Sequence, residues 1–192
     1  MKKNRRENII TRMIQLSSAG QDCKNCPGTC CTFESNSMMT SPLETTELLI
    51  FLQSQGMKNE GLKEKINQTI KQYRLDQLTG YGRKSFLRRT YTCPFFNHSE
   101  LGCPLPVEVK PYGCLAFNSH HPTSKASEHC YSEKELLITR EDENIDYENA
   151  INNALKEKYS LWWDKLPMPV ALMEMWDQDI KEEDLYLTKE AK

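Results

Sequence analysis

The stretch "CKNCPGTCC", residues 23–31, places four of the chain's eight cysteines within nine positions. Four interpretations of such a cluster are open: a disulfide framework, a set of buried apolar residues, a redox pair, or half of a metal-binding site. A second group, Cys93, Cys103 and Cys114, follows much later in the chain, and Cys130 comes after it. The relation between these two groups decides the fold and the function that the sequence predicts.

Composition and charge exclude several classes of protein. The chain has 192 residues, of which 38% are hydrophobic and 27% charged, as is usual for a globular domain. A net charge of −2 gives no electrostatic reason to expect a nucleic-acid partner. The longest apolar run, Leu48–Leu52, is too short to span a membrane, and the basic stretch 1–16 has the apolar spacing of an amphipathic helix. We therefore expect a cytoplasmic protein with no nucleic-acid or membrane partner.

In a reducing compartment, clustered thiols more often bind metal or perform catalysis than form disulfides. The spacing of Cys23 and Cys26 is typical of the first half of a tetrahedral site. Cys30 lies four residues after Cys26, which suits the next turn of a helix. Neighbouring side chains diverge by about 100° on a helix, so Cys30 and Cys31 are expected to serve two centres or one polynuclear cluster, unless one of them is only part of the core.

The identity of the metal stays open at this point. Thiolates suit both zinc and iron. Cys26, Cys93 and Cys103 are each followed by proline, as in bacterial ferredoxins, and this slightly favours an iron–sulfur cluster or iron over zinc. Four thiolates on a divalent metal leave a charge of about −2, which nearby cations could offset. The candidate cations are Arg83, Lys84, Arg88, Arg89 and Lys110, and the candidate nitrogen ligands are His98, His120, His121 and His129.

Periodicity and capping signals predict helices over 4–18, 41–56, 61–80 and 147–165, with a short last helix after Leu166. Ser41, Pro42 and Glu44 form a capping-box pattern, and Gly56 and Gly80 mark expected helix ends. Residues 84–96 have the composition of a strand. Residues 97–131 show no period, so we expect metal ligation to order them.

Together these features predict an α-rich α+β fold, a single domain over residues 1–192 whose helices pack around an irregular, cysteine-organised metal-binding core. The cysteine region would span 23–130, with a helical insert at 41–80 and a C-terminal helical segment at 145–180.

The order Cys-x2-Cys-x3-Cys-Cys, Cys-Pro-Phe, Cys and Lys-Pro-x2-Cys resembles the CxxCxxxCC proteins, the YkgJ-like cysteine-cluster group of bacterial zinc- or iron-chelating proteins. The matching span runs from Cys23 to about Phe117. Family members usually carry arginines where Lys110 and Leu115 stand here, and lysine cannot reproduce the bidentate contacts of a guanidinium. Cys130 lies beyond the span but is kept as a candidate ligand. The ligands that the resemblance implies are Cys23, Cys26, Cys30, Cys31, Cys93, Cys103 and Cys114.

Three functions are compatible with this pattern. The first is an iron–sulfur or multinuclear iron protein with a redox or catalytic role on an unknown substrate. The second is a zinc-stapled module that binds a protein partner. The third is protein lysine N-methylation, because flagellin lysine methylases share a similar cysteine cluster, although no glycine-rich methyl-donor loop is present. Whether the protein is an enzyme is left open; a triad hydrolase or a thioredoxin-like protein is disfavoured.

Overall fold

The computed structural model describes residues 5–18, 28–77, 89–97, 103–119 and 130–187. These residues are mostly helical, with two short antiparallel two-stranded sheets, as expected for an α-rich α+β chain. By its internal contacts the chain divides into two compact units. Unit 1 comprises residues 1–36 and 91–145, and unit 2 comprises residues 37–90 and 146–192. The expected single domain over 1–192 stays a prediction, because this division does not show whether either unit folds alone.

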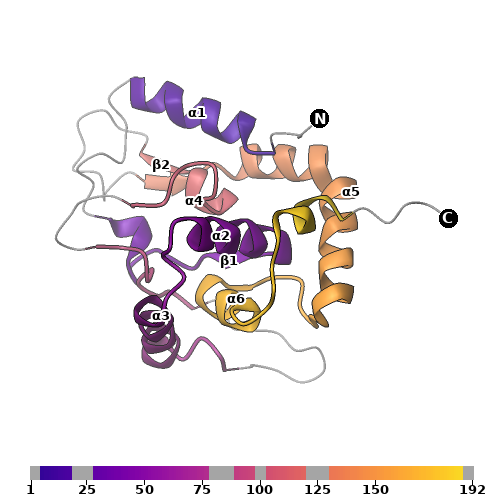
Figure 1. Cartoon of the computed structure of the whole chain (residues 1–192). Coiled ribbons are helices and arrows are strands. Elements are labelled where there is room, and N and C mark those ends of the chain that lie inside the picture. The colour runs from indigo at the N-terminus through magenta and orange to yellow at the C-terminus, as the bar shows by residue number, and fades with distance from the viewer. Residues whose placement is uncertain (1–4, 19–27, 78–88, 98–102, 120–129, 188–192) are drawn as a thin grey trace. The chain divides into compact units, whose positions relative to one another are not determined.

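Unit 1 is built around the N-terminal helix α1, which packs on α4 and β2 (Figure 1). Ile9 is fully buried and packs with Tyr112, Leu115 and Ala116, so the predicted amphipathic helix is confirmed. Side-chain burial of this kind contributes about 2 kcal/mol for each large aliphatic residue. The elements of unit 1 are α1 (Glu7–Ser18), η1 (Thr29–Cys31), α4 (Tyr112–Leu115), β2 (Phe117–Ser119), β3 (Cys130–Ser132) and the first part of α5 (Lys134–Tyr159).

Polar contacts attach α1 to the beginning of α5 within unit 1. The Arg12 guanidinium donates to the Glu133 carboxylate at 3.0 Å. The Asn8 amide donates to Glu143 at 3.0 Å. The Asn8–Glu143 contact is exposed and the Arg12–Glu133 pair is partly buried, so the second is expected to contribute more to the stability of the unit.

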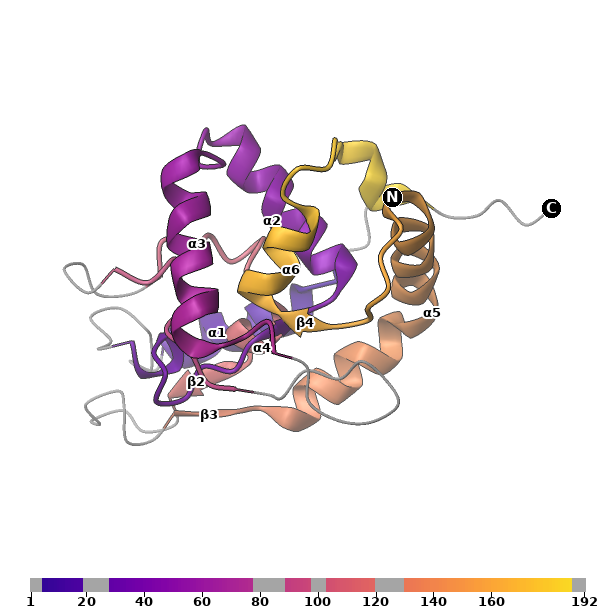
Figure 2. The same ribbon diagram turned by 90° about the horizontal axis from the view of Figure 1, so that it is seen from below.

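Unit 2 is centred on α6, which packs against both α2 and α3 (Figure 2). A second cluster buries Leu43 of α2 against Ile151 and Leu155 of α5. The apolar face predicted for α5 is therefore confirmed at Ile151 and Leu155. Strands β1 and β4 pair antiparallel, with Thr40 opposite Leu166. The elements of unit 2 are β1 (Met39–Thr40), α2 (Pro42–Ser54), α3 (Glu60–Tyr73), the remainder of α5, β4 (Leu166–Pro167), α6 (Met168–Met175) and η2 (Glu182–Tyr186).

The start of α2 confirms the local capping prediction. The Ser41 hydroxyl accepts from the Glu44 N–H, and the Glu44 carboxylate accepts from the Ser41 N–H at 3.0 Å. The N–H groups of Ser41 and Glu44, which have no acceptor within the helix, are therefore both satisfied. Gly56 lies just beyond the C-cap residue Gln55 with φ +65°, the left-handed conformation that glycine adopts without strain. The short last helix, α6, is also present as expected.

Two of the predicted helices have wrong boundaries. Helix α3 ends at Tyr73 rather than near Gly80, because Arg74 turns into the left-handed region at φ 52° and its N–H closes on the carbonyls of Ile70 and Lys71. Helix α5 begins at Lys134, well before residue 147, and ends at Tyr159. The acidic first half of α5 has no periodic apolar pattern, so the sequence pattern did not predict it. Charged residues with good helix propensity form this part of the helix.

The region around the second cysteine group also differs from the prediction. Residues 89–96, the described part of the expected strand, form no strand, since Phe96 N–H donates to the Cys93 carbonyl and closes a turn around Pro94. The supposedly irregular segment 97–131 contains α4 and the paired strands β2 and β3. Ser119 lies opposite Cys130 in that pairing. Within the described residues, no helix is both long and apolar enough to cross a membrane.

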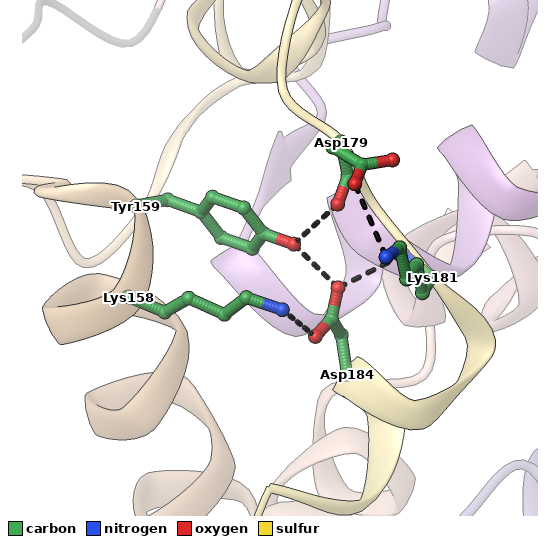
Figure 3. A network of polar contacts seen from close by, with 5 residues as sticks. All are labelled: Lys158, Tyr159, Asp179, Lys181 and Asp184. Carbon is green, nitrogen blue, oxygen red and sulfur yellow. Dashed lines mark hydrogen bonds and ion pairs between the residues drawn. The ribbon is translucent and has the colours of Figure 1, made fainter.

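A polar network closes unit 2 between the end of α5 and η2 (Figure 3). Asp184, only 1% exposed, accepts hydrogen bonds from Lys158, from the Tyr159 hydroxyl and from the Lys181 N–H. The Tyr159 hydroxyl also lies 3.1 Å from the Asp179 carbonyl, and the Lys181 ammonium pairs with Asp179 at 3.2 Å. Burial alone would raise the pKa of Asp184, but the hydrogen bonds from Lys158 and Tyr159 outweigh it and lower that pKa. Burial and the Asp184 bond raise the pKa of Tyr159 to about 12, so the phenol stays protonated as a donor.

We expect Asp184→Asn to lower the free energy of unfolding by about 2 kcal/mol, because the amide cannot accept all of these bonds. A carboxyl with a lowered pKa stabilises the folded state above its usual pKa of about 3.9 and loses that contribution as the pH falls below it. Urea denaturation should therefore show a loss of stability below about pH 4 that is smaller in the variant. Asp177→Asn, at an exposed ion pair with Lys63, is the control and should change little. Equal effects of the two substitutions would contradict this account.

Candidate metal centre

All eight cysteines fall in the sequence ranges of unit 1, and none falls in those of unit 2. Cys23 and Cys26 lie outside the described residues, as do the four candidate histidines. The other six candidates are partly exposed, and none of these six is in a disulfide. The structure places them on η1, in the turn at residue 93, at residue 103, on α4 and on β3: Cys30, Cys31, Cys93, Cys103, Cys114 and Cys130.

Backbone hydrogen bonds bring the first cysteine group beside the second. The Cys93 N–H donates to the Cys31 carbonyl at 2.7 Å. Farther from the cysteines, Asn36 and Tyr91 are joined twice: the Tyr91 N–H donates to the Asn36 carbonyl at 2.8 Å, and the Asn36 amide donates to the Tyr91 carbonyl at 3.0 Å. Asn36 is 5% exposed and Tyr91 fully buried. A buried donor or acceptor that lacks a partner lowers the stability of the fold. These bonds therefore fix the segment before Asn36 beside the segment after Tyr91.

Within the first group, the Sγ atoms of Cys30 and Cys31 are 4.0 Å apart. The sequence argument that neighbouring cysteines diverge assumed regular helix or strand, whereas these two residues lie in the short η1 turn. A tetrahedral metal with sulfur ligands at about 2.3 Å holds two sulfurs about 3.8 Å apart. The pair is therefore close to the spacing that a shared metal requires.

The charges of the thiols are linked across the two groups. Hydrogen bonding to Cys31 lowers the pKa of Cys30, and the same kind of contact lowers the pKa of Cys103 to about 6. The pKa of Cys31 is correspondingly raised, first by its hydrogen bond with Cys103 and then by that with Cys30. Of these three thiols, Cys31 is therefore the one that loses its proton least readily.

Cys114 and Cys93 belong to the same electrostatic group. Desolvation raises the pKa of Cys114 well above its usual value, and the charges of Cys93, Cys103 and Cys30 raise it further. Lys110 acts in the opposite direction, as expected for a cation close to thiolates. Five of the eight predicted ligands therefore influence one another, although they come from segments far apart in the sequence.

No metal-holding group of three or more His, Cys, Asp or Glu side chains is present among the described residues. The structure thus brings Cys30 and Cys31 to metal-like spacing, with Cys93, Cys103 and Cys114 in their electrostatic neighbourhood, and forms no complete ligand shell from the described residues. Cys130 lies on β3, opposite Ser119.

Two buried arginines that the sequence analysis missed surround the segment that leads to Cys114. The guanidinium carbons of Arg6 and Arg140 lie 4.6 Å and 3.4 Å from the centre of the Tyr112 ring. Arg6 also donates to the Lys110 carbonyl at 3.1 Å, so it holds the backbone on both sides of Pro111. Cation–π contacts are stronger when both groups are desolvated, and here the two arginines and the tyrosine are all less than 10% exposed. No local sequence motif predicts this arrangement, because Arg6 and Arg140 are distant from Tyr112 in the sequence.

Of the cations proposed from the sequence, only Arg89 and Lys110 lie within the described residues; Arg83, Lys84 and Arg88 do not. The Arg89 side chain donates to Gln77 at 3.4 Å, and both residues belong to unit 2. Several aromatic residues near the cysteines are buried and give this region an apolar lining: Tyr91, Phe95, Phe96 and Tyr112.

Comparison with known proteins adds no family assignment: no family model matches the chain, and no curated protein or solved structure is significantly similar to it.

We predict that, after chelation, iodoacetamide modifies Cys103 at pH 7 at least about tenfold faster than Cys114, because the thiolate is the reactive form. Because desolvation of the Cys114 thiol also slows its modification, the change at Cys103 in a Cys31→Ala variant is the specific readout. Cys31→Ala should slow modification of Cys103, because it removes the hydrogen bond that lowers the pKa. Peptide mass spectrometry over a short time course measures both rates. Equal rates, or no effect of Cys31→Ala, would contradict the linked charges.

Proposed function

We propose that this protein binds a metal centre through its cysteine cluster, most simply an iron–sulfur cluster or iron, with zinc as the alternative metal. The observation that carries the proposal is the convergence of Cys30, Cys31, Cys93, Cys103 and Cys114 from two distant parts of the chain. Cys23 and Cys26 are proposed to complete the ligand set from the first group. The CxxCxxxCC pattern supports the same assignment.

The donor chemistry fits a soft metal. Thiolates that lie together without a cation repel one another, and this repulsion opposes the ionisation of Cys114. A bound divalent metal or cluster would remove that penalty and displace the proton that Cys31 keeps. The protein's own cations would then balance the remaining negative charge, and Lys110 already acts on three of the thiols.

The two metals imply different roles for the same residues. Bound as an iron–sulfur cluster, the centre would supply one-electron transfer, and bound as zinc it would cross-link the two chain segments. In either case the residues around it would do the same work. The Asn36–Tyr91 and Cys31–Cys93 bonds would orient the thiols, and the buried aromatic side chains would limit the access of water. No feature of the residues that the structure describes favours methyl transfer over these two roles.

The test is elemental analysis and a visible absorption spectrum of the full chain purified anaerobically. We expect a stoichiometric metal in the wild type and a loss of at least about tenfold in affinity for it in Cys31→Ser or Cys103→Ser, because each removes a thiolate ligand. Iron with acid-labile sulfide would favour the redox role, and zinc without colour would favour the interaction module.

Cys130→Ser is the matched control, because Cys130 lies beyond the span of the family resemblance. It should keep most of the metal under the same purification. Wild-type protein that is folded and free of metal would refute the proposed function. Equal retention of metal in all three variants would refute the assignment of the ligands.

A further inference from the structure

In unit 1, Gly28 lies against the ring of Phe96. Gly28 has φ +79°, a conformation that other residues adopt only with strain. A Cβ atom at this position would overlap Cε2 and Cζ of Phe96 and lie 3.1 Å from Cδ2. The ring therefore occupies the space that a side chain at residue 28 would need. Only glycine satisfies both the backbone conformation and the close approach.

Each member of this contact is one turn away from a cysteine. The Gly28 carbonyl accepts from the Cys31 N–H at 2.7 Å, so Gly28 anchors the turn that carries Cys30 and Cys31. The Phe96 N–H donates to the Cys93 carbonyl at 3.0 Å, so its ring is tied to the turn of the second group. Phe96 is only 4% exposed and has little room to move. A shift of the ring is thus transmitted to the spacing of the two cysteine groups.

We propose that Gly28 and Phe96 are a pair of positioning residues that set the distance between the first and second cysteine groups. The role of this pair rests on the proposed function, because the distance between the thiols is important only if they bind one metal centre. The contact itself can be tested without any metal. The pair acts through side-chain packing, in addition to the Cys31–Cys93 backbone hydrogen bond that joins the same two segments.

Gly56 provides a matched control. It has a similar positive φ of +65°, but a Cβ atom there would meet no heavy atom within 4 Å. Gly28→Ala and Gly56→Ala therefore introduce comparable backbone strain, and only Gly28→Ala adds a clash. A second control is Phe96→Leu, which removes both overlapping ring atoms and keeps an apolar side chain in the core.

The experiment uses the full chain after chelation and measures bridging of thiols by dibromobimane, a reagent that links two nearby thiols. Peptide mass spectrometry quantifies the bridge between the segment with Cys30 and Cys31 and the segment with Cys93 and Cys103. We expect a clear bridge in the wild type and in Gly56→Ala. Gly28→Ala should reduce it about tenfold, the size of effect that an overpacked contact produces. Gly28→Ala/Phe96→Leu should recover most of it.

Far-UV circular dichroism of the same samples separates loss of the contact from loss of folding. The proposal is overturned if Gly28→Ala bridges like the wild type, or if Phe96→Leu fails to rescue it, since backbone strain would then explain the loss. It is also overturned if the wild type bridges no more than the urea-unfolded chain. Bridging in the wild type together with an absence of metal would refute the proposed function and leave the positioning pair standing.

Discussion

The bond from the Cys93 N–H to the Cys31 carbonyl, 2.7 Å long, joins two segments that the sequence separates by the whole helical insert. The Asn36–Tyr91 bonds extend this pairing, and the packing of Phe96 on Gly28 joins the same two segments. Without this register the two cysteine groups would not share an environment. The thiol charges, the proposed metal and the positions of the buried aromatic rings all depend on it.

The helical insert begins and ends at this pairing of the two segments. Residues 37–90 belong to unit 2 and are inserted between Asn36 and Tyr91 of unit 1. The hydrogen bonds between Asn36 and Tyr91 therefore hold the two ends of the insert together. Within unit 2, α2, α3 and α6 bury their own apolar surface, and the Asp184 network satisfies the polar groups at the end of α5. Elsewhere in unit 1, Arg6 and Arg140 hold Tyr112 and the turn that leads to Cys114.

Local signals predicted the parts of the fold that depend on a few neighbouring residues. The Ser41–Glu44 capping box and the Gly56 stop are set by backbone groups within one turn, so the sequence was sufficient there. The early start of α5 was missed because its charged first half has no apolar period, and the end of α3 was missed because Arg74 adopts a left-handed conformation that is rare for arginine. For the candidate site, the cysteine spacing identified the thiols, but Arg6, Arg140 and Asn36 act over long distances in sequence and gave no signal.

The most direct measurement is X-ray absorption at the metal edge of the protein purified anaerobically. The account predicts a first shell of sulfur atoms, at about 2.3 Å for zinc, because thiolates from both cysteine groups are the proposed ligands. A first shell made only of oxygen and nitrogen atoms, or the absence of stoichiometric metal in folded protein, would contradict it.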